Sequence, residues 1–439
     1  MSTAIIELND SEIRLGTGDN IVLRQPGYAV LADTGITTGK QAYAMARSNP
    51  RQTYHRYWSQ LNQDSLLVPS RLARHHADLA YAQLLAMHEQ AGKPEEVVFA
   101  VPGNYSREQL ALLLGIVEAC PFTAVGLVDT ATACVAAIAE QGLYNHVDIH
   151  LHYALVSTLE VTDHVSRTSV KVINDTGLAD IHDICVASFA DAFIDQSRFD
   201  PLHHAETEQE LYNLIPGALR TLRAGGELTL EINFKNNRYQ ARIFSEPLLE
   251  KLKAHYENIY RELTGTSVPL ISDRLHGLPG FSGQLGNAIA LDEQAVFQGC
   301  NTNLMNIRTD GPSLSFITRL PASKSPTVNG GTGTSHQIDR MVPVAAAATH
   351  LLINHRAYAL GPSAVYVSAN GVIVANSTSD NKHCSFRRTA TGIEIRPESE
   401  LTVFVNGNRL LAMKIGTTGD TVSFAGADTV IRLIEVAPD

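Results

Sequence analysis

The stretch of sequence that decides the fold is residues 97–139, VVFAVPGNYSREQLALLLGIVEACPFTAVGLVDTATACVAAIA. Residues 97–101 form a short apolar run closed by a Pro-Gly pair, which is typical of a strand buried on both faces. Residues 106–109 (SREQ) make a capping-box pattern ahead of a helix that carries leucines on one side. Residues 123–128 predict a second strand, and an alanine-rich helix follows it. This alternation of strands and helices predicts an α/β fold.

The composition is that of a folded protein, with 44% hydrophobic and 18% charged residues among 439. A chain of this length is expected to form two or three domains. The formal charge of −11, with no dense cluster of Lys or Arg, argues against nucleic acid as a partner. Five cysteines without a C-x-x-C pair suit reduced thiols, and the longest apolar run, residues 341–353, is shorter than the ~20 residues of a membrane span. We therefore expect a cytoplasmic protein without a membrane span.

The pattern along the chain divides it into three parts. Short strands in the first thirty residues are followed by alternating helices and strands to about residue 262. From residue 301 the composition shifts to Asn, Gly, Ser, Thr and Pro, which is typical of a linker. After the linker the pattern is β alone, and two Asn-Gly dipeptides between alternating runs predict hairpins in a β-sandwich. The predicted parts are a first domain (1–300), a linker (301–340) and a sandwich (341–439).

The first predicted domain resembles DnaK-type heat-shock chaperones and the wider actin-like ATPase superfamily. In that family a strand ending in Val-Pro is followed by a helix, a strand and a Glu-Pro-Thr-Ala-Ala helix. Here Val-Pro at 101–102 and DTATA at 129–133 hold these places. Residues 25–58, 176–196 and 210–222 are similar to further family segments, in the family's order. The resemblance implies a trimmed, two-lobed actin-like (ribonuclease H-like) fold.

In the actin-like superfamily two β-hairpins wrap the phosphates of ATP, and the resemblance places the first of them at Glu7, Asn9 and Asp10. The acid is kept as Glu7, but Asn9 replaces a glycine and Asp10 adds a charge that repels phosphate. The second hairpin, matched to residues 150–155 (HLHYAL), lacks both the acid and the glycines. Thr130 takes the place of the catalytic glutamate. These losses together predict a pseudo-ATPase with no catalytic residue.

A turn at Gly277, Pro279 and Gly280 is similar to the family's nucleoside-contacting loop. It leaves nucleotide binding without hydrolysis open, so the turn and the first hairpin stay candidate nucleotide-pocket residues. We expect neither a resident cofactor nor a metal site, with bound Mg-ATP as the alternative.

The last ninety residues resemble a forkhead-associated (FHA) domain, because a Val-Asn-Gly hairpin, a Gly-Asp-x-Val-x-Phe run and a final Ile-Arg-Leu-Ile-Glu-Val strand follow in the family's order. That family binds phosphothreonine through an Arg after a Gly, a Ser-Arg-x-His motif and an Asn on the next loop. Here Gly361 precedes a proline, Asp380 and Asn381 stand in the Ser and Arg places, and His383 matches. With Asn406 these residues form the candidate ligand face, where Asp380 disfavours a phosphate.

The sequence as a whole predicts a non-catalytic scaffold, adaptor or assembly component. Its partners are expected to be other proteins, either further copies of the chain or a related active partner. Three alternatives stay open: an ATP-binding chaperone-like switch, a phosphothreonine-dependent signalling adaptor, and a polymer-forming cytoskeletal protein.

Overall fold

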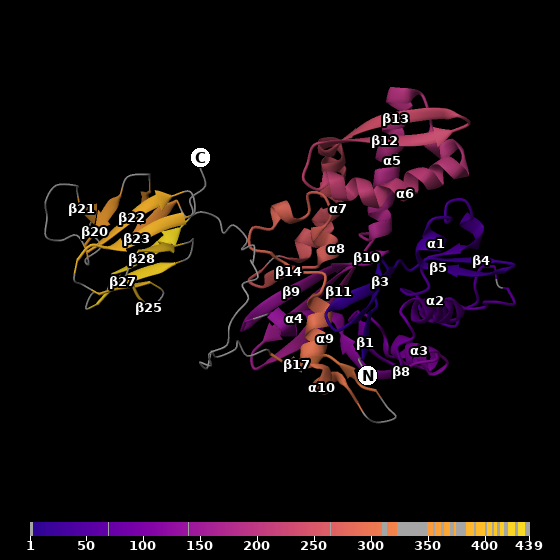
Figure 1. The fold of residues 1–439 in the computed structure, drawn as a ribbon, viewed down its shortest axis with the longest axis horizontal. Coiled ribbons are helices and arrows are strands. Elements are labelled where there is room, and N and C mark those ends of the chain that lie inside the picture. Colours follow the sequence, from indigo (N-terminus) through magenta and orange to yellow (C-terminus); the bar gives the residue numbers. More distant parts are fainter. Residues whose placement is uncertain are drawn as a thin grey trace. The chain divides into compact units, whose positions relative to one another are not determined.

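The computed structural model divides the chain into two compact units, residues 1–328 and 329–439. The residues that the structure describes are 3–68, 70–138, 140–263, 265–309, 314–322, 349–353, 356–360, 364–368, 373–374, 383–389, 392–399, 402–405, 408–410, 413–416, 420–425 and 429–434. Over these residues the protein is mixed α/β with ten α-helices, and its second unit is built of antiparallel strands (Figure 1). The α/β class of the first part and the β pattern of the last part are thereby confirmed. None of the helices in the described residues has the length and apolar character needed to cross a bilayer.

The first unit contains two large sheets, and the first of them is built around the amino-terminal strand. In spatial order its strands are β16 (Phe316–Ile317), β8 (Thr123–Asp129), β7 (Glu96–Val101), β1 (Ala4–Glu7), β2 (Ile13–Thr17) and β3 (Asn20–Gln25). β1, β2 and β3 form an antiparallel meander, whereas β7 pairs parallel with β1 and β8 pairs parallel with β7. β7 is almost wholly buried, as its apolar run predicts.

Two helices, α2 (His76–Gln90) and α3 (Arg107–Glu118), pack on one face of this sheet. The predicted capping box starts α3: Ser106 Oγ accepts a hydrogen bond from Gln109 N, and Gln109 Oε1 accepts one from Ser106 N. The local sequence thus fixes where the helix begins, and its apolar side fixes which face it covers.

The second large sheet repeats the topology of the first. Its strands, in spatial order, are β15 (Ile289–Ala290), β14 (Val268–Ile271), β9 (Gly142–Ile149), β10 (Tyr153–Val161), β11 (His164–Asn174) and β17 (Arg319–Pro321). Again three consecutive strands, β9 to β11, form an antiparallel meander, and the next two, β14 and β15, continue the sheet in parallel from β9. In both sheets the first strand of the meander is therefore central and leads into a hairpin.

Two helices, α4 (Thr130–Ile138) and α9 (Ala295–Thr302), form a common core with both sheets. Side chains from β1 and β7 on one side and from β10 and β11 on the other contact this core. The two helices approach each other closely at Gly299, where a Cβ atom would lie 1.9 Å from the carbonyl oxygen of Ala133.

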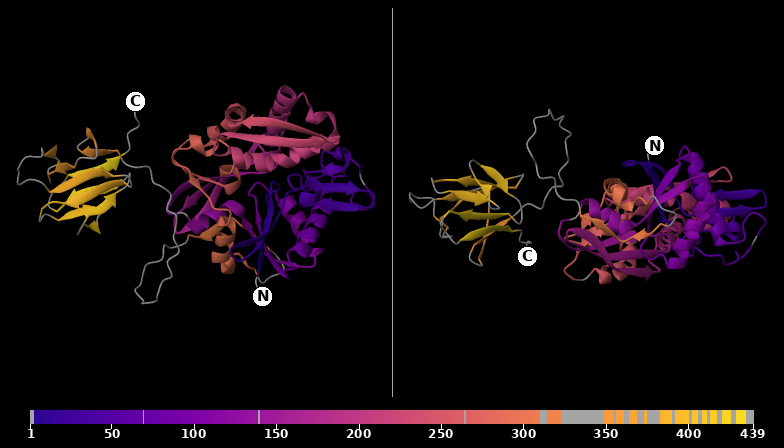
Figure 2. Two further views of the ribbon diagram at one scale, coloured as in Figure 1. Left: turned by 45° about the horizontal axis from the view of Figure 1, so that its top comes forward. Right: turned by 90° about the horizontal axis from the view of Figure 1, so that it is seen from below.

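Each large sheet carries a smaller subdomain between its third and fourth strands. The first is a sheet of β5 (Gly35–Thr38), β4 (Ala29–Ala32) and β6 (Thr53–Tyr54) with α1 (Gly39–Tyr43). The second pairs the hairpin of β12 (Glu227–Phe234) and β13 (Asn237–Phe244) with α5 (Leu178–Ser197), α6 (Ala205–Leu222) and α7 (Ser245–Glu262). Figure 2 shows these two subdomains, indigo and rose, side by side in the first unit.

The first unit extends beyond the expected domain end at residue 300. The short helices α8 (Asp273–His276) and α10 (Leu304–Ile307) belong to it, and β16 and β17 pair with β8 and β11 in its two large sheets. The described residues between 301 and 322, which were predicted to belong to the linker, are therefore part of the first unit. Polar composition gave a misleading boundary here, because two short edge strands add few apolar residues to the stretch.

The second unit consists of two antiparallel sheets. One contains β19 (Arg356–Ala359), β18 (His350–Ile353), β28 (Val430–Ile434), β27 (Thr421–Phe424), β24 (Val403–Val405) and β25 (Asn408–Arg409). The other contains β21 (Ile373–Val374), β20 (Val365–Val367), β22 (Cys384–Thr389), β23 (Gly392–Pro397) and β26 (Lys414–Gly416). Alternate apolar side chains of both sheets form one shared core, as period-2 patterning predicts.

Replacing Gly299 by alanine is expected to destabilise the first unit by about 1–3 kcal/mol, because the new Cβ forces α9 away from α4. The matched control is Gly115→Ala in α3, where nothing lies within 4 Å of the added atom. This control is expected to gain up to about 1 kcal/mol from helix propensity. Urea unfolding followed by the fluorescence of Trp58, the single tryptophan and a buried residue of this unit, measures both changes. Equal effects of the two substitutions would contradict the close helix contact.

Candidate functional site

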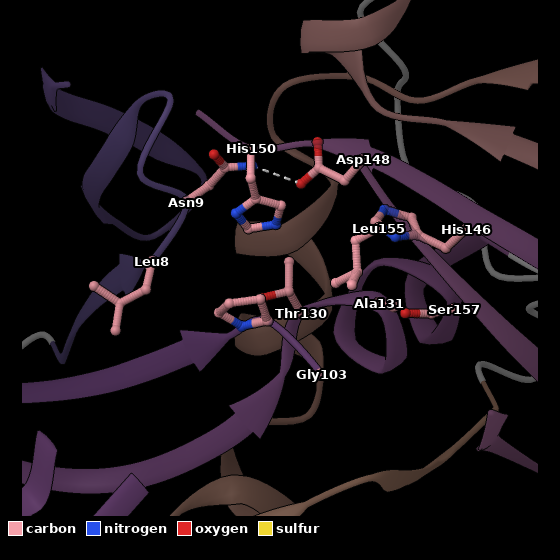
Figure 3. A pocket seen from close by; sticks show the side chains of 11 residues that line it. Leu8, Asn9, Gly103, Thr130, Ala131, His146, Asp148, His150, Leu155 and Ser157 are labelled. Atoms are coloured by element: carbon pink, nitrogen blue, oxygen red, sulfur yellow. Dashed lines mark hydrogen bonds between the residues drawn. The ribbon is translucent and has the colours of Figure 1, made fainter. Parts of the chain in front are cut away.

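The two hairpins that start the large sheets face each other, and their tips are hydrogen-bonded together. Asn9 Nδ2, in the β1–β2 tip, donates to Asp148 Oδ2 at 2.9 Å and to the carbonyl oxygen of Ile149 at 3.0 Å, both at the end of β9 (Figure 3). Ser11 Oγ contacts the same Ile149 oxygen at 3.2 Å. All of these groups are buried. Asn9, which replaces a glycine of the family's pattern, joins one hairpin to the other.

Asp10 makes the second link between the tips. Its Oδ1 accepts a hydrogen bond of 2.8 Å from the backbone N–H of Leu151 and lies 3.4 Å from His150 Nδ1. Burial raises the pKa of Asp10, but the hydrogen bond and charge of His150 and the Leu151 amide outweigh burial and leave this pKa below its usual value. The carboxylate is therefore held ionised by the opposite hairpin.

An arginine from α8 lies between the two acids that precede the tips. Arg274 Nη1 is 2.8 Å from Glu7 Oε1 and 3.7 Å from Asp148 Oδ2, and its Nη2 donates to the carbonyl oxygen of Glu12 at 3.0 Å. Burial raises the pKa of Asp148, yet the Arg274 charge, followed by His150 and His146, holds it well below its usual range. Burial lowers the pKa of Arg274, but the charges of Glu7 and Asp148 more than offset that and raise it. Each buried charge thus has an opposite partner.

A second guanidinium extends this network to the edge of the site. Arg14, on β2, makes two hydrogen bonds to the Asp273 carboxylate, of 2.9 and 2.6 Å, and Asp273 is the first residue of α8. Arg14 is only 3% exposed, so this fork-to-carboxylate pair fixes α8 against the first sheet.

Another ion pair joins the two large sheets at the end of β8. Asp129 Oδ1 accepts hydrogen bonds from Thr132 N at 2.8 Å and Thr132 Oγ1 at 2.7 Å, which start α4. The other oxygen, Oδ2, pairs with Arg167 of β11. Thr130, matched by sequence to the catalytic glutamate, is buried, and its hydroxyl has no hydrogen-bond partner within the described residues.

Little space is left between the hairpins. The cavity there has a volume of about 10 Å³ and lies against Asn9, Gly103, Thr130, Asp148 and His150 among others (Figure 3). A volume of this size holds about one water molecule. In this arrangement the side chains themselves occupy the space between the tips, and a phosphate group fits only if the hairpins separate.

The candidate turn at Gly277, Pro279 and Gly280 is bound to α7. Tyr256 Oη donates to the carbonyl oxygen of Pro279 at 3.2 Å. Gly280 has a φ of +75°, and a Cβ there would lie 2.7 Å from Leu249 Cδ2 of α7. The structure therefore gathers Glu7, Asn9 and Asp10 into one network, whereas this turn packs on a helix of the second subdomain.

The candidate FHA-like ligand face stays a prediction. Gly361, Asp380, Asn381 and Asn406 lie outside the described residues. His383 precedes β22; its backbone N–H donates to the carbonyl oxygen of Val367 at 3.2 Å and its ring lies edge-on to Phe424.

Sequence reasoning placed the second hairpin two residues too late. β9 ends at Ile149, and the N–H of His150 bonds to the carbonyl oxygen of Tyr153, so the tip lies at residues 150–153. The acid that corresponds to Glu7 is therefore Asp148, and it is present rather than lost. The pair Asp148-Ile149 parallels Glu7-Leu8, a signal that was available in the sequence. The sequence around Arg274 carried no such signal, because the two acids that it contacts, Asp148 and Glu7, lie 126 and 267 positions away along the chain.

No family model matches this chain, and no curated protein matches it.

Replacing Arg274 by methionine is expected to destabilise the first unit by about 3–5 kcal/mol, because Glu7 and Asp148 then stay buried without a counter-charge. Urea unfolding monitored by Trp58 fluorescence measures the loss. The control Lys251→Met removes an exposed pair, 3.9 Å from Asp191, and should change stability by no more than about 0.5 kcal/mol.

A triple variant separates charge from packing in this prediction. With Glu7→Gln and Asp148→Asn added to Arg274→Met, no charge is left unpaired, so the triple variant is expected to be more stable than the single one. A single variant as stable as the wild type would show that Arg274 does not neutralise the two acids.

Proposed function

We propose that residues 1–328 form a two-lobed, actin-like unit whose nucleotide site has been replaced by a permanent internal bridge, and that the chain acts as a non-catalytic scaffold or adaptor. Two features support the actin-like assignment. The two large sheets repeat one strand order, with a subdomain inserted at the same point of each. Their leading hairpins face each other, as the phosphate-wrapping hairpins of that superfamily do.

The observation that carries the proposal is the direct bonding of the two hairpin tips. In an ATPase of this superfamily the tips contact phosphate. In this chain Asn9 contacts Asp148, and Asp10 contacts Leu151, with a residual cavity of about 10 Å³. The Arg274 guanidinium holds the position between the two acids at which a bound cation would neutralise them.

Nucleotide binding would have to break this bridge at a high cost. Each hydrogen bond to a charged group contributes about 1.5–3 kcal/mol, and at least two such bonds join the tips. A triphosphate would then face the carboxylates of Asp10 and Asp148, which repel it. Closure of the lobes is thus independent of a ligand, which is the property that a scaffold of fixed shape requires.

The partner side of the proposal rests on the sequence. We infer that the second unit docks a protein segment without a phosphate, because Asp380 and Asn381 stand where the FHA-like pattern has Ser and Arg. The first unit would present its surface to further copies of the chain or to a related active partner, in the cytoplasm.

Mg-ATP at millimolar concentration is expected to produce neither binding heat nor a change in melting temperature with the full chain. Isothermal titration calorimetry and differential scanning fluorimetry measure these quantities, with Mg²⁺ alone as the control. A ligand at 100 times its Kd stabilises by about 2.7 kcal/mol, which shifts the melting temperature of a unit this size by at least a degree or two. A saturable heat together with such a shift would replace the scaffold proposal by the ATP-binding switch.

A further inference from the structure

A second set of contacts joins the two lobes between the two small subdomains and reaches the β9–β10 tip at one end. Tyr28 and Tyr43 come from the first subdomain and Tyr212 from α6 of the second. The hydroxyls of Tyr28 and Tyr212 are 3.1 Å apart, and Tyr43 Oη donates to the carbonyl oxygen of Tyr212 at 3.2 Å. The Arg47 guanidinium lies over the Tyr212 ring at 4.3 Å. We call these contacts, together with the three histidines described next, the seam.

Two histidines meet across the seam at one end. His55 follows β6 in the first lobe, and His152 lies in the β9–β10 tip of the second. His55 Nδ1 and His152 Nε2 are 3.1 Å apart, the rings are stacked at 4.9 Å, and His152 Nε2 is also 2.8 Å from the carbonyl oxygen of His55. In this geometry one hydrogen bond between the two nitrogens can join two neutral rings. The same geometry brings two positive charges together when both rings are protonated.

A third histidine lies at the other end of the tyrosine cluster. His182, on α5, is 5% exposed and lies edge-on to Tyr43 and Tyr212, with ring centroids 6.3 and 5.6 Å apart. Its Nδ1 is buried and has no hydrogen-bond partner within the described residues. The nearest charge that acts on it is the cation of Arg47. A proton added at Nδ1 of this ring therefore lacks a hydrogen-bond acceptor while the seam is closed.

The charged groups around the three rings act in both directions. The Arg47 and Arg56 cations oppose protonation, whereas Asp10 favours it at His55 and His152 and Asp180 favours it at His152, without outweighing burial. The acids that face the seam already have partners: Asp10 binds the Leu151 amide, Asp180 the Gly177 amide and Asp183 the Arg47 guanidinium, which also contacts Glu208.

We propose that His55, His152 and His182 form an acid-sensitive latch, whose protonation separates the two small subdomains while the two large sheets stay folded. The proposal concerns side chains other than the acids and the guanidinium of the hairpin bridge and holds whether or not a nucleotide binds.

The direction of the pH effect follows from the difference in proton binding between the closed and open seam. Burial lowers the pKa of His55 to about 4, with His152 and Arg56 acting in the same direction. Burial likewise lowers the pKa of His182 to about 4, with Arg47 acting in the same direction. In an open seam both rings return towards the ordinary 6.5, so the open state binds more protons between pH 6.5 and 4. Closure is complete above pH 6.5 and weakens as the pH falls towards 4.

The large sheets respond differently over the same range. Asp10 and Asp148 have pKa values below their usual range, so the hairpin bridge stays ionised at pH 5. Burial lowers the pKa of His146, in the core of β9, but the nearby acids Asp148, Asp129 and Glu7 partly offset burial there. At the seam Asp10 favours protonation of His55 and His152, but burial outweighs it, and the charge that acts on His182 is the Arg47 cation. The seam is therefore expected to open first.

Hydrogen–deuterium exchange of the full chain at pH 7 and pH 5, corrected for the intrinsic exchange rate, tests the latch. Peptides of β4 and α6 are expected to exchange faster at pH 5, by about 20-fold for each seam histidine that titrates, while peptides of β7 and β10 stay protected. Unchanged exchange at the seam would overturn the proposal. A simultaneous loss of protection in all peptides would also overturn it, because that result means global unfolding.

Two variants and a control assign the effect to the histidines. His182→Phe keeps an aromatic ring in the seam, and His152→Gln removes the ring pair. Each variant is expected to lower the increase in seam exchange between pH 7 and pH 5 by a factor of up to about 20. His203→Gln, at an exposed histidine outside the seam, should respond as the wild type does. If both seam variants keep the full wild-type response, the latch is not made of these residues.

Discussion

The ion pairs of Arg274 with Glu7 and Asp148 are the interaction on which the rest of the first unit depends. Glu7 is the last residue of one central strand and Asp148 is next to the last residue of the other, and both are buried. Without a counter-charge between them the sheets would repel each other at their closest point. A guanidinium fixed on α8 satisfies both acids and the Glu12 carbonyl group, so the two halves meet in one arrangement without needing a ligand.

The repeated topology explains why the gap between the two hairpin tips decides how the first unit closes. Each sheet starts with a central strand that carries an acid at or next to its last residue and turns into a hairpin. Because the two halves have the same topology, their hairpins face each other, and whatever occupies the gap decides whether the unit is open or closed. Here the gap is occupied by Asn9, Asp10 and His150. The changes that fill the gap are also the ones that depart from the phosphate-binding pattern.

The sequence predicted local features well and long-range pairings poorly. The β7 strand, the capping box of α3 and the position of Glu7, Asn9 and Asp10 in one hairpin depend on neighbouring residues, and the structure agrees with them. The second hairpin was matched to residues 150–155, two residues after its acid, Asp148, because without the family's glycines the sequence does not mark where β9 ends. Arg274 was missed because an arginine between an aspartate and a leucine on a short helix has no local feature that indicates a buried bridge. The linker was expected to include residues 316–321 because β16 and β17 are short edge strands in a stretch otherwise rich in Asn, Gly, Ser, Thr and Pro.

The two closures of the first unit differ in the chemistry that holds them, and that difference sets how they can be controlled. The hairpin bridge uses carboxylates and guanidinium groups, which stay ionised across the physiological pH range because each lies beside an opposite charge. The seam uses tyrosines, which stay neutral, and histidines, which are neutral when buried and gain a positive charge as the pH falls. A bridge of the first kind fixes a shape, whereas contacts of the second kind can be released without breaking it. In a unit built from both, the hairpin bridge stays closed while the seam can open. A partner that binds between the small subdomains would compete with the seam alone.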